Sequence, residues 1–207
     1  MHESSNVHYE EREIQGERLE LTSKEAIYWL GPNVTLQRCT LVIGVGRRQL
    51  VPMWGTLLDC TITAKREVVE QCWTSIRFEG CRFTGRFSGI RFGQRVGVDR
   101  WWEHGGIANC DFSEARLDQC VFHGCDMRTI RLPKWPCFTI VDPIKHGREL
   151  LRVPWPGDFI PVTLEGPLKE QPSTSAVTLY APAEAKRSGA ALEEFRSAVE
   201  RFDFIVR

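Results

Sequence analysis

The sequence predicts a mainly β fold, a parallel β-helix followed by a C-terminal α-helix. Two overlapping repeats predict the coil, one of about 21 residues marked by cysteines and one of five residues. A single amphipathic stretch near the C-terminus predicts the helix. The chain of 207 residues, 42% of them hydrophobic, is long enough for a substantial core and too apolar for a disordered chain.

The longer repeat is visible in the spacing of four cysteines and in the residues around them. Cys39, Cys60 and Cys81 lie 21 residues apart, and Cys110 follows after 29. Their contexts read TLQRCTL, TLLDCTI, RFEGCRF and GIANCDF. Alignment gives two apolar columns, Leu36, Leu57, Phe78 and Ile107 in one and Leu41, Ile62, Phe83 and Phe112 in the other. The longer last interval predicts a protruding loop, 94–106, inserted into one turn.

The shorter repeat runs through 110–134 as five consecutive five-residue units. Each unit begins with a small or aliphatic residue and carries a large apolar residue two positions later. The segments Ile76-Arg-Phe-Glu-Gly and Cys81-Arg-Phe-Thr-Gly follow the same rule. Four units make about one long period, so both repeats describe one four-sided turn.

Strand geometry explains why such a chain coils. The first and third residues of a unit point inward and the second points outward, and the last two turn a corner. Turns stacked about 4.8 Å apart pair as parallel strands, so equivalent residues form ladders. We expect a ladder of buried Cys39, Cys60, Cys81 and Cys110. The outward positions predict a second ladder of Thr40, Thr61, Arg82 and Asp111. Within it we expect Arg82 and Asp111 to form an ion pair.

The five-residue units resemble the pentapeptide-repeat family. The match is best over 105–134, weaker over 74–93 and loose over 34–73, and the family's Asp at the second position stands at Asp111 and Asp126. The resemblance implies a right-handed quadrilateral β-helix. It also implies two functions known in the family or in similar small bacterial proteins: imitation of duplex DNA that binds topoisomerases, and immunity against a cognate toxin.

The two ends complete the predicted organisation. Residues 1–33 are expected to form an N-terminal strand or cap, 34–140 the coil, and 141–207 an irregular segment ending in a helix over about 182–204. Gly189 weakens the middle of this helix. Its apolar stripe, which either caps the coil or forms a homodimer, comprises Leu192, Phe195, Val199 and Phe202.

Charge and hydropathy exclude several classes of protein. The 27 basic and 27 acidic residues cancel, but residues 1–34 carry −4 and 35–132 carry +4. This balance argues against a nucleic-acid binder, and the positive coil argues against a DNA mimic. The sequence has neither an apolar run that could cross a bilayer nor a signal-peptide pattern. We therefore expect a cytoplasmic protein with reduced cysteines and no membrane partner.

Motifs for metal or catalytic chemistry are absent from the sequence. It lacks CxxC, P-loop, nucleophile-elbow and HExxH patterns. Cys120, His123 and Cys125 form only a poor ligand set, and the repeat explains the cysteines without zinc. We expect no metal and no cofactor.

The inserted loop is the predicted contact site. It is rich in the aromatic and arginine side chains that dominate protein interfaces, namely Arg95, Arg100, Trp101, Trp102, Glu103 and His104. The sequence favours a non-enzymatic, protein-binding β-helix, with neutralisation of a cognate toxin as the leading hypothesis. The alternatives are a topoisomerase-binding DNA mimic and a carbohydrate-active β-helix enzyme. An enzyme of this kind predicts converging carboxylates near His104, a candidate general base beside Glu103 and two tryptophans.

Overall fold

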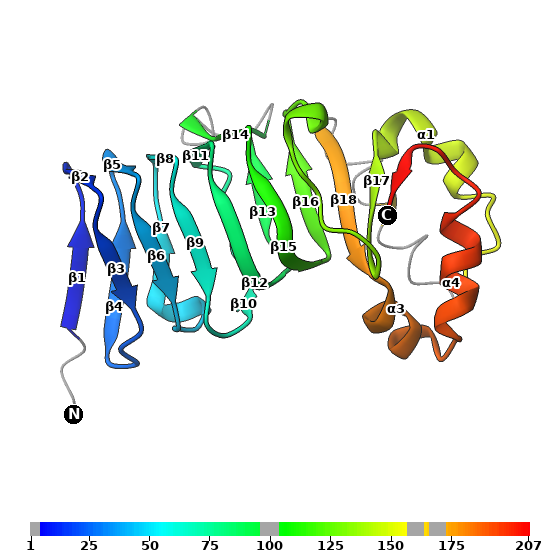
Figure 1. Ribbon diagram of the computed structural model, residues 1–207, viewed down its shortest axis with the longest axis horizontal. Coiled ribbons are helices and arrows are strands. Elements are labelled where there is room, and N and C mark those ends of the chain that lie inside the picture. Colours follow the sequence, from blue (N-terminus) through cyan, green and yellow to red (C-terminus); the bar gives the residue numbers. More distant parts are fainter. Residues whose placement is uncertain (1–4, 96–103, 157–163, 166–172) are drawn as a thin grey trace.

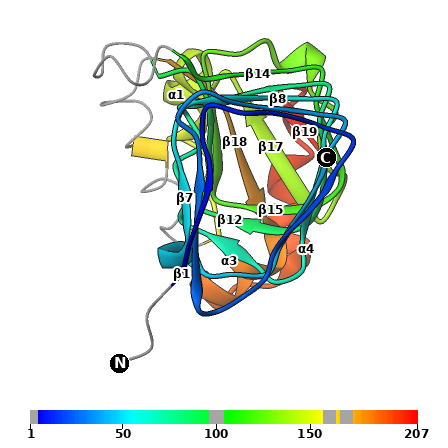
Figure 2. The ribbon, with the colours of Figure 1, turned by 90° about the vertical axis from the view of Figure 1, so that its left-hand side faces the viewer.

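The computed structural model describes residues 5–95, 104–156, 164–165 and 173–207. Parallel strands stack into a β-solenoid of about 4 turns, strands make up 46% of the chain, and helices follow at the C-terminal end. Figure 1 shows the coil from the side, and Figure 2 shows its turns superposed in one closed outline. The predicted fold class is confirmed.

Each side of the coil is a sheet whose neighbouring strands come from successive turns. Sheet A contains β1 (Ser5–Tyr9), β4 (Ala26–Leu30) and β7 (Leu50–Pro52). Sheet B contains β2 (Glu13–Gln15), β5 (Val34–Gln37), β8 (Gly55–Leu58), β11 (Ile76–Glu79) and β14 (Gly106–Ala108). Sheet C contains β3 (Arg18–Leu21), β6 (Thr40–Ile43), β9 (Thr61–Ala64), β10 (Val68–Val69), β12 (Arg82–Ser88) and β15 (Asp111–Asp118). Short 3-10 helices interrupt the coil at Arg47–Gln49 and Met127–Thr129.

The fourth sheet joins the coil to the C-terminal module, by which we mean the described residues of 134–207. Sheet D contains β13 (Arg91–Gly93), β16 (Cys120–His123), β18 (Thr174–Tyr180), β17 (Cys137–Val141) and β19 (Ile205–Val206), in that order. Strands β13 and β16 are parallel, whereas β18 pairs antiparallel with both β16 and β17. The antiparallel strand therefore ends the parallel stack and covers the last turn (Figure 1).

The register confirms the predicted ladders. On sheet B, Leu36 lies opposite Leu57, and Phe78 lies between Leu57 and Ile107. On sheet C, the Phe83 and Phe112 rings stack with centroids 4.2 Å apart. Outside the coil, Arg82 contacts Asp111 at 3.7 Å, as the sequence predicted. The pattern of single residues thus fixes which turn lies on which.

The middle of the coil is filled mainly by aromatic rings. Trp73 packs against Phe78, Phe83, Phe87 and Phe92, with ring centroids 5.6–6.4 Å apart. All five are at most 3% exposed. Burying one such side chain stabilises a fold by about 1.5–3 kcal/mol, so this cluster is a major source of the coil's stability.

The cysteine ladder is structural. Cys39, Cys60, Cys81 and Cys110 are each 1% exposed, and their thiols donate to backbone carbonyls. The adjacent Cys81 thiol and burial raise the pKa of Cys60, so that thiol stays protonated. Within the described residues, no three His, Cys, Asp or Glu side chains converge as a metal site.

The C-terminal helix differs from the prediction. The chain forms α1 (Pro143–Leu150) and then two short helices, α3 (Ala181–Ser188) and α4 (Leu192–Val199), in place of one helix over 182–204. Gly189 adopts φ +70°, which ends α3 and turns the chain. Phe195 and Val199 are buried in a second core, and Leu192 and Phe202 pack against it. Much of the stripe is thus covered by the chain's own strands and helices.

Two buried carboxylates and a partly exposed arginine attach this module to the coil. Arg187 of α3 donates to the carboxylates of Glu184 and of Asp118, which ends β15. Asp118 also accepts the backbone N–H of Tyr180 at 3.2 Å. Arg116 stacks over the Tyr180 ring at 4.8 Å. Charge-assisted hydrogen bonds therefore connect the last turn to α3.

Candidate functional site

The predicted contact residues are only partly within the described structure. Arg100, Trp101, Trp102 and Glu103 lie outside the described residues, whereas Arg95 and His104 lie within them. Burial, followed by the charge of Arg95, lowers the pKa of the His123 imidazole, while His104 lines a cleft on sheet B whose wall also includes Gln94.

Two glycines hold the base of the inserted loop against the coil. A Cβ on Gly105 would lie 1.7 Å from the Thr74 carbonyl oxygen, and one on Gly93 would lie 2.0 Å from the His123 carbonyl oxygen. Gly93 also has φ +87°. Only glycine permits such close approach of two backbones. The chain thus leaves and rejoins the coil at fixed points, which places His104 beside sheet B.

The cleft beside His104 is polar and has a volume of about 450 Å³. Thr56 and Arg77 occupy successive positions of one outward ladder, with Gly106 next in register. Because Gly106 has no side chain, the ladder leaves space beside Arg77. The described lining residues are Asn33, Val34, Thr35, Trp54, Gly55, Thr56, Arg77, Gln94, His104 and Gly105.

A second hollow of about 600 Å³ lies around the corner, where sheet A ends. Its walls are mainly apolar, and the ion pair between Arg47 and Glu70 stands at its border. Its other lining residues are Leu50, Val51, Pro52, Met53, Trp54, Gln71, Cys72 and Ser75. Its size is within the range of preformed ligand pockets. We call it the apolar groove.

The groove exists because two turns of the coil are not paired here. Strand β7 is the last strand of sheet A, while the following turn pairs with sheet D through Cys72 and Arg91. Met53 donates its N–H to β4, so the backbone groups of Leu50 and Pro52, three and one positions earlier, face the open edge. Proline has no N–H to donate there, which ends the ladder.

Two buried polar side chains take the place of the missing ladder. The Gln71 amide donates to the carbonyls of Arg47 and Leu50 at 3.1 and 3.3 Å, and the Ser75 hydroxyl donates to the Met53 carbonyl at 2.9 Å. These bonds satisfy the carbonyl of Leu50 in β7 and those of Arg47 and Met53 on either side of the strand, while they keep the two backbones apart. The groove is therefore a preformed feature of the coil.

Trp54 is the residue shared by the cleft and the groove. It stands at the corner between sheets A and B and lines both hollows. Its indole N–H donates to Asn33 at 3.0 Å, and the Asn33 amide donates to Glu11 at 2.8 Å. The ring is thus held in place. We call the cleft, the groove and Trp54 together the Trp54 surface.

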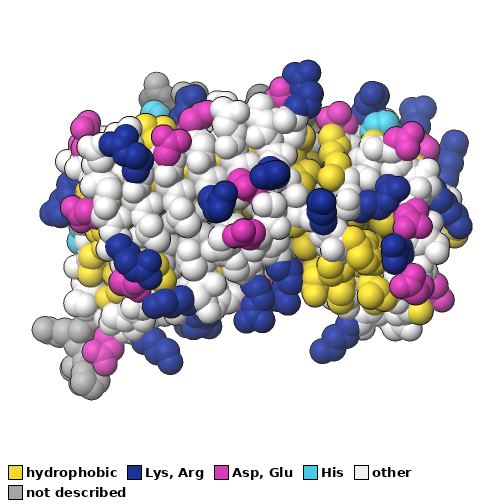
Figure 3. All heavy atoms as spheres, viewed as in Figure 1, with side chains coloured by type: hydrophobic (Ala, Val, Ile, Leu, Met, Phe, Trp, Pro, Cys, Tyr) yellow, Lys and Arg dark blue, Asp and Glu magenta, His cyan; other side chains and the backbone are white. Residues whose placement is uncertain are grey.

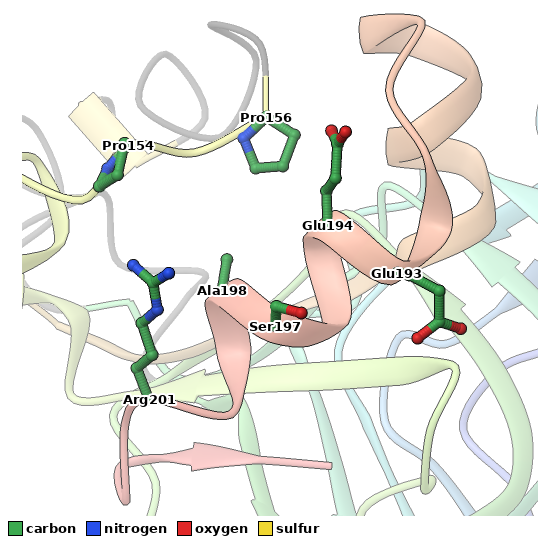
Figure 4. Close-up of a pocket in the computed structure, with 7 residues that line it drawn as sticks. All are labelled: Pro154, Pro156, Glu193, Glu194, Ser197, Ala198 and Arg201. Atoms are coloured by element: carbon green, nitrogen blue, oxygen red, sulfur yellow. The ribbon is translucent and has the colours of Figure 1, made fainter.

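A third hollow lies on the C-terminal module, with a volume of about 430 Å³. Figure 4 shows Arg201 and Glu194 at its two ends, Ser197 and Ala198 between them on α4, and Glu193 directed away. Pro154 and Pro156 form the facing wall. Among the described residues, its carboxylates belong to no group of three His, Cys, Asp or Glu side chains that could hold a metal ion.

Comparison with known proteins gave no match, whether to family models, to curated proteins or to solved structures. Within the described residues, no helix has the length and apolar character needed to cross a bilayer.

Proposed function

We propose that this chain is a non-enzymatic β-solenoid that binds another protein through the Trp54 surface. The observation that carries this proposal is the juxtaposition of a preformed apolar groove and a polar cleft on either side of a fixed tryptophan. Protein interfaces have this anatomy, an apolar centre with a polar rim, and tryptophan is among the residues that contribute most to their affinity.

The solenoid also suits recognition energetically. Trp54 is held by a hydrogen bond, and the groove by Gln71 and Ser75, so little side-chain freedom remains to be lost on binding. The outer face in Figure 3 carries both charge signs side by side over the coil. A DNA mimic needs a strongly negative face, so this mixture favours a protein partner of another kind.

Neutralisation of a cognate toxin is the specific function we propose. It rests on the resemblance of the five-residue units to pentapeptide repeats and on the elaborated site at one corner of the coil. In this proposal the chain acts in a bacterial cytoplasm, where its thiols stay reduced, and forms a 1:1 complex with the toxin.

Co-expression with the product of the adjacent reading frame tests the proposal. Wild-type protein should relieve toxicity and co-purify, whereas Trp54→Ala should weaken binding by about 30-fold or more, as expected for a central tryptophan. Trp29→Ala is a matched control, because Trp29 is also half-buried and also donates to an asparagine, Asn6, but lies outside both hollows. Equal protection by wild type and Trp54→Ala would contradict the assigned surface.

A further inference from the structure

The two ends of the coil differ in how their strands are covered. Strand β18 and the C-terminal module cover the last turn. At the other end, β1, β2 and β3 are the terminal strands of sheets A, B and C, and no described strand pairs with their outer edges. Figure 1 shows β1 at the extreme of the long axis.

The hydrogen bonds show which backbone groups face this end. In β1, Ser5 donates to Glu25 and Tyr9 accepts from Gly31, so alternate residues of β1 point toward β4. The remaining N–H and C=O groups, those of Asn6 and His8, point to the open edge. The same alternation in β2 and β3 turns outward the backbone groups of Glu13, Gln15, Arg18 and Glu20.

Apolar side chains of the first turn are also incompletely covered. Val7, Tyr9 and Ile14 are only partly buried against the coil core. Their partners one turn further in, Tyr28, Leu30 and Leu36, are 5%, 3% and 0% exposed. A further strand on this end would cover Val7, Tyr9 and Ile14, just as the first turn covers the equivalent residues of the second turn.

Charge narrows the identity of such a strand. Residues 5–21 contain five glutamates and two arginines, and all seven side chains are exposed. Of the glutamates, Glu13 and Glu17 have no basic partner among the described residues, whereas Glu20 pairs with Arg18 and Lys65. A second copy stacked end to end would bring the same excess of negative charge, which disfavours it. A basic strand would be attracted.

We infer that the open edge of β1 binds an extended segment of another protein in which apolar residues alternate with Lys or Arg. Its backbone pairs with Asn6 and His8, its apolar side chains cover Val7 and Tyr9, and its basic side chains lie near the glutamates of the first turn. This is strand addition at a sheet edge, in which backbone bonds give affinity and side chains give selectivity. The site is distinct from the Trp54 surface and does not depend on it.

A short fluorescent peptide of alternating Lys and Val is the probe, and one of alternating Glu and Val is its control. Anisotropy should show that the full chain binds the Lys peptide at least about tenfold more tightly than the Glu peptide. Hydrogen exchange should slow at the Asn6 and His8 amides. Equal binding of both peptides, no binding, or protection elsewhere would overturn the inference.

Variants at the edge sharpen the test. His8→Pro removes an outward N–H without breaking the pairing of β1 with β4, and should weaken Lys-peptide binding about tenfold or more. His8→Ala, the matched control, should bind within about twofold of wild type. Glu13→Lys with Glu17→Lys should reverse the peptide preference. Unchanged binding by His8→Pro, or a concentration-dependent dimer whose interface protects these amides, would reject the inference.

Discussion

Two buried titratable residues make the stability of this protein depend on pH in opposite directions. Glu184 is fully buried and one of its carboxylate oxygens has no hydrogen-bond partner in the described chain. His123 is equally buried, and both its nitrogens are unpartnered there. Burial raises the pKa of Glu184 to about 7, against the pull of Arg187, and lowers the pKa of His123 to about 4.

Glu184→Gln should abolish a loss of stability that the wild-type protein shows as pH rises. The folded-state pKa lies above the unfolded value of 4.5, so the folded state holds the proton more tightly and the free energy of unfolding falls as pH rises from about 4.5 through 7. The full effect is at most about 3 kcal/mol. Urea unfolding at about pH 5 and pH 8 should show this loss in wild type only. An equal loss in Glu184→Gln would assign it to another group.

His123→Leu should remove part of the protein's sensitivity to acid. The folded-state pKa lies below the unfolded value of 6.5, so the unfolded chain binds a proton first and the free energy of unfolding falls as pH drops from about 6.5 toward 4. This loss is also up to about 3 kcal/mol in wild type. Denaturant titrations at about pH 7 and pH 5 measure it, and an unchanged acid slope in the variant would refute the assignment.

At the scale of elements, the base of the inserted loop offers a matched pair of glycines. Gly105→Ala should lower the free energy of unfolding by about 1–3 kcal/mol, since its Cβ would collide with the Thr74 carbonyl. Gly106→Ala should change it by less than about 0.5 kcal/mol, because its Cβ would meet only the Arg77 side chain, at 3.6 Å. Thermal unfolding compares them, and similar losses would show that the close approach does not matter.

Substitution of Gln71 tests whether its side chain holds the apolar groove open. Gln71→Leu leaves the carbonyls of Arg47 and Leu50 without their donor and should cost about 1–3 kcal/mol of unfolding free energy. Gln49→Leu is a control. Gln49 precedes β7 and also bonds backbone groups, those of Gly46 and Lys24, but it does not line the groove. An unchanged free energy of unfolding in Gln71→Leu would show that the Gln71 hydrogen bonds do not hold the two turns apart.

The sequence predicted the elements unevenly, for physical reasons. Ladders place equal residues above one another, so the spacing of Cys39, Cys60 and Cys81 was enough to predict the pairing of Leu36 with Leu57. The same register places Gly106 beside Arg77, so the sequence contained the information needed to predict the cleft at the loop base. The groove was not, because it depends on hydrogen bonds from the Gln71 side chain to the carbonyls of Arg47 and Leu50 in the preceding turn. Periodicity carries no information about such contacts.

The helical segment shows a second limit of periodicity. Phe195 and Val199 of the apolar stripe are buried, but the stripe begins at Leu192, after Gly189, so it carries no information on whether the helix continues across that glycine. A left-handed glycine reverses the chain at little cost, and the ionic contacts of Arg187 with Asp118 then hold α3 against the coil. Local pattern alone does not reveal this long-range attachment.

At the scale of the whole molecule, the C-terminal module protects the coil as well as extending it. Deleting 134–207 removes β17, β18 and the helices, and leaves the β16 edge and the buried Phe122 region uncovered. We expect the truncated coil to aggregate, because an open edge is a template for intermolecular pairing. Light scattering at increasing concentration checks this. A monodisperse, folded product would contradict the protective role of the module.

We propose that the Trp54 surface recognises a protein partner. The most direct test is a hydrogen-exchange comparison of the free chain with its complex with the co-expressed product of the adjacent reading frame. We predict slower exchange at residues 50–54 and 71–77, which border the groove and the cleft, and loss of that protection in Trp54→Ala but not in Trp29→Ala. Protection confined to other surfaces, with Trp54→Ala binding as wild type does, would contradict the claim.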